Sequence, residues 1–269
     1  MKIPFLKFHG AKNDFLLTMS SHAPVTGLPQ IAVAICDRHT GVGGDGWLIV
    51  DTSAGDCDAA IRLFNSDGSE PELSGNGTRC VAALLASRDP GQAEFRIQTP
   101  AGLKLLRLIS QHAGEYIFEM NMGDVRVVEL HASVQGQDAI ILDVGNPQCA
   151  VPVGSFDLPW RTLGHDIEHD PRFPNRTNVS FIQPVDRHTI EVRFWERGAH
   201  ETNSSGTGST GAAMAAVARG YAESPVTVLT PAGPLTVRID QIEEAVWLTG
   251  PAELVADGVF YAAETGSST

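Results

Sequence analysis

Two short segments of the chain, Ser74–Thr78 and Ser205–Ser209, have nearly the same sequence and lie 131 residues apart. Each reads Ser-Gly-x-Gly followed by a hydroxyl residue, and each leads into a run of small apolar residues. The tetrapeptide Thr-Pro-Ala-Gly recurs at the same offset, at Thr99–Gly102 and Thr230–Gly233. Two markers in one order at one spacing predict an internal duplication, in which two copies of one fold are joined in tandem.

The repeated turn is a predicted anion-binding element. A polar residue in front of a Gly-x-Gly turn that opens an Ala-rich helix lies beside backbone N–H groups that have no partner. The helix dipole adds roughly half a positive charge at that end. If a pseudo-twofold axis relates the two copies, Ser74 and Ser205 are expected to face each other across a cleft that holds a small carboxylate.

Composition limits the class of protein. A chain of 269 residues with 42% hydrophobic residues can form one core in each half. The net charge of −13 and the lack of a basic cluster argue against nucleic acid or an anionic membrane as partner. No signal-peptide pattern or membrane-length apolar run is evident, so a cytoplasmic location is expected. The four cysteines are scattered, which predicts free buried thiols and no metal site.

The pattern of apolar runs and turn residues predicts an α+β fold of two pseudo-symmetric domains, each a mostly antiparallel sheet wrapped around a central helix. The expected division is residues 1–123, residues 124–263 and a polar tail at 264–269. Helices are predicted at Pro29–Asp37, from Ser74 to about Ser87 and from Ser205 to about Tyr221. Strands are predicted at Ile3–His9, Leu16–Met19, Trp47–Val50, Ala59–Asn65, Glu94–Thr99, Leu103–Ser110, Tyr116–Met120, Ile140–Val144, Val179–Gln183, Thr189–Trp195, Val226–Leu229, Leu235–Asp240 and Ala245–Thr249.

Four asparagines in loop-like contexts are candidate ligand-binding residues: Asn13, Asn65, Asn146 and Asn178. Taken singly, each is explained by turn chemistry, because asparagine tolerates left-handed backbone. As a set beside two anion-binding turns, the amides can recognise the ammonium and carboxylate groups of an amino acid. The adjacent residues Glu196 and Arg197 either form a solvated surface pair or bind the same two groups, with Arg197 on the carboxylate and Glu196 on the ammonium.

Three other patterns are set aside. The segment His165–His169 matches the H-x-x-E-H metalloprotease pattern, but the surrounding prolines and glycine favour a short helical turn with solvated histidines. The Gly-rich loop Gly41–Gly46 lacks the Lys-Ser/Thr of a phosphate loop. No Gly-x-Ser-x-Gly nucleophile elbow is present, so a serine hydrolase has little support.

The chain resembles the diaminopimelate epimerase family, which are cofactor-independent amino-acid epimerases. The resemblance runs along nearly the whole length, in the motifs Phe8–Phe15, Asp37–Gly43, Asn65–Ser69, Gly75–Cys80, Gly145–Pro147, Arg176–Asn178, Trp195–Gly198, Glu201-Thr202 and Gly206–Gly208. It implies two similar halves with the substrate in the cleft between them. It also implies an enzyme of lysine biosynthesis that uses no cofactor. Dimers are common among similar proteins, so a homodimer is an expected assembly.

The resemblance also implies site residues. In the family two cysteines, one from each half, remove and return the α-proton, and Ser74 and Ser205 occupy their positions. By the same matching, the substrate would be held by Asn13, Asn65, Gly75, Asn76, Asn146, Asn178, Glu196, Arg197, Gly206 and Thr207. Two further departures lie within these motifs: Gln148 replaces the usual histidine, and His200 stands where the family has glycine.

The two serines pose a chemical problem. A cysteine thiol has a pKa near 8.5, whereas the pKa of an aliphatic hydroxyl is far higher, and generating the base from it costs roughly 10 kcal/mol more. The serines are therefore engineered replacements, natural residues activated by another base such as Glu196 or water, or remnants of a pocket that has lost the reaction. Because Leu73, Ser204 and Gln148 also depart from the family, natural divergence is favoured.

Three functions follow from these alternatives. The leading one is epimerisation of LL- to meso-diaminopimelate by two-base proton transfer at the α-carbon. The second is a related cofactor-free isomerase or a hydroxy-amino-acid dehydratase. The third is an amino-acid-binding protein that has lost catalysis.

Overall fold

The computed structural model describes residues 1–53, 55–71 and 73–262 and divides the chain into two compact units. Unit 1 comprises residues 1–119 together with the described residues from Pro251 onward, and unit 2 comprises residues 120–250. This division differs from the expected one mainly at the C-terminus, where the last strand from Pro251 onward belongs with the first half. The reason is a long antiparallel pairing that runs from Lys2 opposite Tyr261 to His9 opposite Glu253. The polar tail expected at 264–269 lies outside the described residues.

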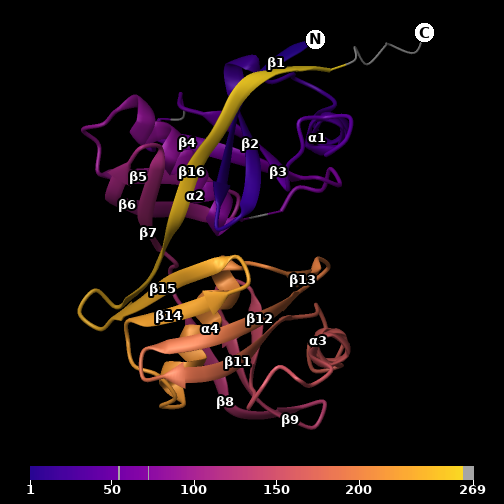
Figure 1. Cartoon of the computed structure of the whole chain (residues 1–269), viewed down its shortest axis with the longest axis vertical. Coiled ribbons are helices and arrows are strands. Elements are labelled where there is room, and N and C mark those ends of the chain that lie inside the picture. The colour runs from indigo at the N-terminus through magenta and orange to yellow at the C-terminus, as the bar shows by residue number, and fades with distance from the viewer. Residues whose placement is uncertain (54, 72, 263–269) are drawn as a thin grey trace. The chain divides into compact units, whose positions relative to one another are not determined.

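Unit 1 is a sheet that closes around a helix (Figure 1). The strands pair in the order β1 to β7, then β16, and β16 pairs back onto β1. Their bounds are β1 Lys2–Gly10, β2 Asn13–Met19, β3 Gly46–Asp51, β4 Ala59–Asn65, β5 Glu94–Thr99, β6 Gly102–His112, β7 Glu115–Asn121 and β16 Ala245–Tyr261, with helices η1 Ser20–His22, α1 Leu28–Cys36 and α2 Gly75–Arg88. Every residue of α2 from Asn76 to Ala86 is buried, so this helix lies inside the sheet.

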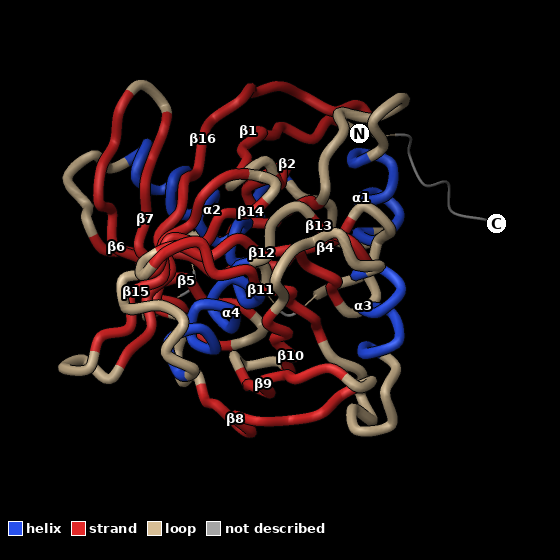
Figure 2. The backbone as a smooth tube through the Cα atoms, turned by 60° about the horizontal axis from the view of Figure 1, so that its bottom comes forward, coloured by secondary structure: helices blue, strands red, loops and turns tan. Residues whose placement is uncertain are grey.

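Unit 2 repeats the arrangement around α4, which lies among the strands in Figure 2. The strand order is β16-β15-β14-β12-β11-β10-β9-β8, and β13 pairs with β12. The bounds are β8 Arg126–Val134, β9 Gln137–Asp143, β10 Pro147–Pro152, β11 Asn178–Asp186, β12 Thr189–Glu196, β13 His200–Thr202, β14 Val226–Thr230 and β15 Gly233–Asp240, with helices α3 Trp160–Glu168 and α4 Gly206–Ala218. The small residues of α4 are almost all buried, which lets the strands approach its backbone closely.

The predicted α+β class and internal duplication are confirmed. Both repeated Ser-Gly-x-Gly segments begin a central helix, and both copies of Thr-Pro-Ala-Gly form a hairpin turn. In the first copy the Thr99 hydroxyl donates to the carbonyl of Gly102 over 2.8 Å, and in the second Thr230 donates to Gly233 over 2.7 Å. The tetrapeptide therefore recurs because its threonine closes the β5–β6 and β14–β15 turns in the same way.

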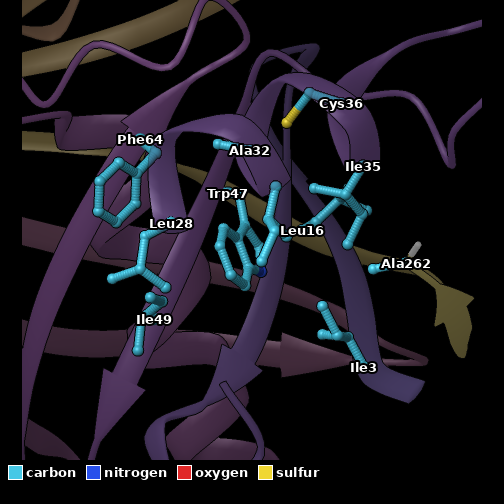
Figure 3. Close-up of a cluster of buried hydrophobic side chains, with 11 residues drawn as sticks. Ile3, Leu16, Leu28, Ala32, Ile35, Cys36, Trp47, Ile49, Phe64 and Ala262 are labelled. Atoms are coloured by element: carbon cyan, nitrogen blue, oxygen red, sulfur yellow. The ribbon is translucent and has the colours of Figure 1, made fainter. Parts of the chain in front are cut away.

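An outer helix packs on the sheet of each unit. Figure 3 shows Trp47 of β3 at the centre of a cluster that joins α1 to the strands. The indole N–H of Trp47 donates to the hydroxyl of Thr18 over 2.9 Å, which satisfies its polar atom in the core. In unit 2, Trp160 and Ile167 of α3 pack against Phe181 in a second cluster. Helix α3 is longer than the short turn expected near His165, since it begins directly after Pro159 and extends to Glu168.

Four stretches of strand were not predicted: β8, β10, β13 and the second half of β16. The second half of β16 has mostly exposed side chains, Leu254 and Val259 among them, so it lacks the buried alternation on which strand prediction depends. Strand β10 begins and ends at a proline, which reads as a loop in the sequence.

Within the described ranges, no helix is both long and apolar enough to cross a membrane.

Candidate active site

Ser74 caps the central helix of unit 1. Its backbone is extended, and its hydroxyl oxygen accepts the N–H of Gly77 over 3.1 Å. The first backbone bond inside α2 runs from the N–H of Thr78 to the carbonyl of Ser74 over 2.9 Å. Helix geometry therefore leaves the N–H groups of Gly75 and Asn76 without an intrahelical acceptor. These two N–H groups are the predicted carboxylate binders of the first half.

A chain of side-chain amides extends from this cap. The buried amide of Asn76 donates to Oδ1 of Asn13 over 3.2 Å, and Asn13 in turn donates to Oδ2 of Asp45 over 2.6 Å. On its other side, Oδ1 of Asn76 accepts a hydrogen bond from the guanidinium of Arg79. These contacts determine which end of each amide is the oxygen. Two of the predicted substrate-binding asparagines, Asn13 and Asn76, thus lie in direct contact.

Asn13 follows a hairpin turn with unusual backbone. Ala11 and Lys12, the two residues of the β1–β2 turn, both have positive φ, of 51° and 62°. Such a turn normally takes Asn-Gly, because most side chains disfavour this conformation. A strained turn directly before a predicted ligand residue is typical of functional sites.

A cluster of charges holds the same end of the sheet together. The guanidinium of Arg38 contacts the carboxylates of both Asp14 and Asp45, over 2.7 and 2.8 Å, and Lys7 lies 3.0 Å from Asp14. Burial acts to raise the pKa of Asp14, but the hydrogen bonds from Arg38 and Lys7 outweigh it and lower the pKa to about 2. Arg38 thus joins the ionised Asp14 to Asp45, the residue that orients Asn13.

Asn65 lies at the same edge of the sheet but outside the amide chain. It ends β4 opposite Gly46, the residue after Asp45. Its amide donates to the hydroxyl of Ser69 over 2.9 Å, within the turn that follows β4. The structure thus places Asn65 next to the network, with its side chain engaged by its own turn.

In unit 2, Ser205 caps α4 in the same way, but its hydroxyl also donates a hydrogen bond to a carboxylate. The oxygen accepts the N–H of Gly208 over 3.1 Å, and the hydroxyl donates to Oε2 of Glu196 over 2.9 Å. The other carboxylate oxygen of Glu196 accepts the hydroxyl of Thr202 over 2.5 Å. Ser205 is only 4% exposed, so this contact lies in a protected environment. The first backbone bond of α4, from Ser209 to Ser205, leaves the N–H groups of Gly206 and Thr207 without an intrahelical acceptor.

The environment of Glu196 changes its acidity. Burial raises the pKa of Glu196 above that of an ordinary glutamate, and the hydrogen bonds from Thr202 and Ser205 offset only part of this effect. A carboxylate with a raised pKa is a stronger proton acceptor than an exposed one. The hydroxyl of Ser205 therefore faces a base.

A fully buried carboxylate, Glu168, holds the turn that carries Glu196 and Arg197. Its oxygens accept the N–H of Gly198 over 3.1 Å, the indole N–H of Trp195 over 2.8 Å and the guanidinium of Arg176 over 3.1 Å. One side chain thus joins the end of α3 to β12 and to the turn between β12 and β13. Glu168 belongs to the H-x-x-E-H segment, and within the described residues no group of side chains is arranged to hold a metal ion.

Asn178 and Arg197 are tied into this turn as well. The amide of Asn178 donates to the carbonyl of Pro147 over 3.0 Å, and its oxygen accepts the backbone N–H of Arg197 over 3.0 Å. The guanidinium of Arg197 is exposed and donates to the carbonyl of Asn175 over 3.1 Å. Asn178 therefore positions the turn, whereas the exposed guanidinium of Arg197 retains N–H groups that a ligand can use.

The remaining predicted residues meet at the start of α4. The amide of Asn146 lies 3.4 Å from the hydroxyl of Thr207, and the amide of the buried Gln148 donates to Oδ1 of Asn146 over 2.7 Å. Gln148, the residue that departs from the family pattern, thus orients a predicted ligand residue. Its own Oε1 is buried without a hydrogen-bond partner among the described residues.

Each unit therefore brings together most of its predicted residues around a serine cap. The first group contains Ser74, Gly75, Asn76 and Asn13, with Asn65 beside it, and the second contains Ser205, Gly206, Thr207, Asn146, Asn178, Glu196 and Arg197. Sequence reasoning missed Asp45, Thr202, Glu168 and the role of Arg79. All four lie in sequence motifs already described, but no local pattern shows which side chain each one contacts.

The fold and these two caps define a class of proteins in which two similar sheet-around-helix units occur in one chain. A solved structure of a phenazine biosynthesis protein of the PhzF family from Bacillus anthracis has this fold, with a TM-score of 0.74 and 17% identity, covering 97% of this chain and 100% of that one. At that identity the likeness concerns the fold alone.

Sequence comparison is more specific. The family model described as diaminopimelate epimerase matches residues 5–128 and 140–255. A diaminopimelate epimerase from Ectopseudomonas mendocina is 40% identical over 278 residues, covering 96% of this chain and 99% of that protein. Another from Microcystis aeruginosa is 36% identical over 279 residues, covering 97% and 99%. The chain belongs to the diaminopimelate epimerase family.

Proposed function

We propose that this protein is a cofactor-independent isomerase that interconverts LL- and meso-diaminopimelate by moving the proton on one α-carbon. Family membership supports the reaction class and the substrate. The main structural support is the 2.9 Å hydrogen bond from Ser205 to Glu196. A serine without such a partner does not readily become a base, whereas here the carboxylate can accept the hydroxyl proton.

The proposed proton path uses this pair. As the oxygen of Ser205 takes the α-proton, its own hydroxyl proton passes to Glu196, so a free alkoxide need not form first. The electron pair of the broken C–H bond is left on the α-carbon and its carboxylate. The hydroxyl of Ser74 then donates a proton to the α-carbon. Solvent returns a proton to Ser74 and removes one from Glu196, which restores the starting state.

The two caps supply the electrostatics for this path. The unpaired N–H groups of Gly75 and Asn76, and those of Gly206 and Thr207, are suited to bind carboxylate oxygens. Negative charge grows on the substrate carboxylate as the α-proton leaves. Donors that are already oriented toward an anion stabilise that charge without reorganisation.

Proton NMR in deuterated water tests the proposal. We expect the α-proton signal of LL-diaminopimelate to disappear in the presence of the protein, with meso-diaminopimelate appearing. Ser205→Ala should abolish exchange. Calorimetric binding of either isomer without any exchange would contradict the catalytic proposal and identify an amino-acid-binding protein instead.

One observation favours a second candidate. Within the described residues the hydroxyl of Ser74 has no carboxylate acceptor, so the two caps are chemically unequal. One activated base and one hydroxyl acid suit the loss of water from a hydroxy amino acid, since elimination needs a base at one carbon and an acid at the leaving group. Formation of an imine or keto acid from hydroxyproline-like substrates would identify this activity.

Assembly and location are proposed with the function. We expect a cytoplasmic enzyme that acts on a small amino acid and forms a homodimer. Exposed apolar side chains on β16 support a protein contact there: Leu254, Val255, Val259 and Tyr261 are between 44% and 70% exposed. Analytical ultracentrifugation of the whole protein tests the dimer, and a monomer at micromolar concentration would contradict it.

A further inference from the structure

Arg79 is a fully buried arginine whose charge has no counter-ion in the described part of the chain. It lies in the first turns of α2 and has 0% exposure. Its Nη2 donates to Oδ1 of Asn76, its Nε donates to the carbonyl of Pro251 over 3.3 Å, and its Nη1 is buried with no hydrogen-bond partner among the described residues. Arg38 and Arg176, by contrast, each contact a carboxylate. Arg79 contacts only neutral oxygens.

Burying a charge without a partner is costly, so such a group normally has an anion beside it. Burial lowers the pKa of Arg79 to about 10, which still leaves the guanidinium protonated at neutral pH. The cation therefore persists in the folded protein. Either the guanidinium of Arg79 has no counter-ion at all, or a bound ligand supplies one.

The surroundings place this charge at the predicted carboxylate site. Arg79 bonds directly to the side chain of Asn76, whose backbone N–H is one of the two unpaired donors at the start of α2. The end of β1 is packed tightly on the same turn, because a Cβ on Gly10 would lie 3.1 Å from the carbonyl oxygen of Asn76 and 3.2 Å from that of Pro251. Two hydrogen bonds hold the buried guanidinium behind this closely packed helix start.

We propose that Arg79 is a positioning residue whose buried charge attracts the carboxylate of the substrate to the first turn of α2, so that the bound substrate acts as its counter-ion. The inference rests on the proposed function. The inference goes beyond the proposed function because it assigns the positive charge of the site to Arg79, which acts through Asn76. The charge should also stabilise the extra negative charge that develops on the carboxylate when the α-proton leaves.

The matched test uses two arginines of the same helix. Arg79→Met removes the buried charge, and Arg88→Met removes an exposed charge from the last turn of α2. Calorimetry of the whole protein with meso-diaminopimelate should give an affinity at least about tenfold weaker for Arg79→Met and unchanged for Arg88→Met. Arg79→Lys keeps the charge with a different shape and should bind within about threefold of the unchanged protein.

The outcomes separate this inference from the proposed function. Equal binding by a folded Arg79→Met overturns the inference and leaves the epimerase proposal intact. If Arg79→Met does not fold, Arg79→Lys decides, and a loss of more than tenfold in a folded lysine variant overturns it. If the unchanged protein binds no diaminopimelate, the proposed substrate is wrong. Acetate then serves as the probe, and for the inference to stand it should raise the melting temperatures of the unchanged protein and of Arg79→Lys more than that of Arg79→Met.

Discussion

Ser205 donates its hydroxyl hydrogen to Glu196 over 2.9 Å, in a place where burial raises the pKa of the carboxyl group. A serine hydroxyl hardly ionises at neutral pH because its pKa lies far above that of a thiol, but a hydroxyl that can pass its proton to an adjacent carboxylate need not ionise first. This contact distinguishes the second cap from the first, where the hydroxyl of Ser74 accepts only a backbone N–H in the described residues. It also makes Glu196 the most informative residue to change.

Glu196→Gln should abolish α-proton exchange and stabilise the protein. The amide cannot accept the proton, so we expect exchange to fall by about a hundredfold or more. Because the folded pKa of Glu196 is raised, the native state binds more protons than the unfolded state just above the usual glutamate pKa, and stability falls as pH rises through that window. The variant lacks this loss, so its melting temperature should exceed that of the unchanged protein at pH 8 and approach it toward pH 4.

Glu201→Gln is the control for that experiment. Glu201 lies on the same hairpin but is exposed, and its pKa is lowered by the hydrogen bond from Arg161. Its replacement should leave exchange nearly unchanged and should not stabilise the protein at pH 8. An equal gain in melting temperature from both changes would contradict the assigned role of burial at Glu196.

Replacing both Ser74 and Ser205 by cysteine should raise the exchange rate by about a hundredfold or more. A thiol at a helix start has a far lower pKa than a hydroxyl, so the base forms readily. Burial raises the pKa of the native thiols Cys36, Cys80 and Cys149 to about 12, so they should resist alkylation. Cys57, the fourth native cysteine, is only partly buried, so it is replaced by serine in the test protein. Iodoacetamide labelling followed by mass spectrometry then reports the two new thiols. A double variant that labels fully but exchanges no faster would show that the serines do not limit the rate.

Adding one methyl group to each cap should have unequal effects. A Cβ on Gly208 would lie 2.9 Å from both the hydroxyl of Ser205 and the ring of Phe194, whereas a Cβ on Gly77 would lie 3.4 Å from the hydroxyl of Ser74. Gly208→Ala should therefore displace Ser205 from Glu196 and reduce exchange at least tenfold, with some loss of stability. Gly77→Ala should reduce it less. Equal losses measured by NMR would argue against a special role for the Ser205–Glu196 contact.

Arg38→Met should make the protein more sensitive to acid. The folded pKa of Asp14 is lowered to about 2, so its ionised form contributes stability above the usual aspartate pKa, and that contribution is lost as pH falls from about 4 toward 2. Removing Arg38 raises the folded pKa and shifts acid unfolding, followed by circular dichroism, to higher pH. Arg62→Met is the control, since its pair with Glu70 is exposed and worth little. An acid transition that shifts equally in both variants would contradict the prediction.

Local sequence patterns determined a large part of this fold. Both central helices begin where the repeated Ser-Gly-x-Gly segments predicted, because an N-cap serine and a glycine turn act through backbone bonds a few residues away. The hairpins at Thr99 and Thr230 were marked by their repetition for the same reason. The strand from Pro251 to Tyr261 was missed, because its partner β1 lies at the other end of the chain.

By itself, the sequence determined the duplication, the two serine caps, the family and most of the residues that gather around each cap. Only the tertiary structure decided that Glu196 meets Ser205, that Glu168 holds the turn carrying Glu196, and that Arg79 is buried without an anion. A cap or a hairpin turn depends on neighbours along the chain, and the sequence records those neighbours directly. The acidity of a carboxyl group and the isolation of a guanidinium depend instead on which distant segments exclude water from them, and that is settled only when the sheet closes around its helix.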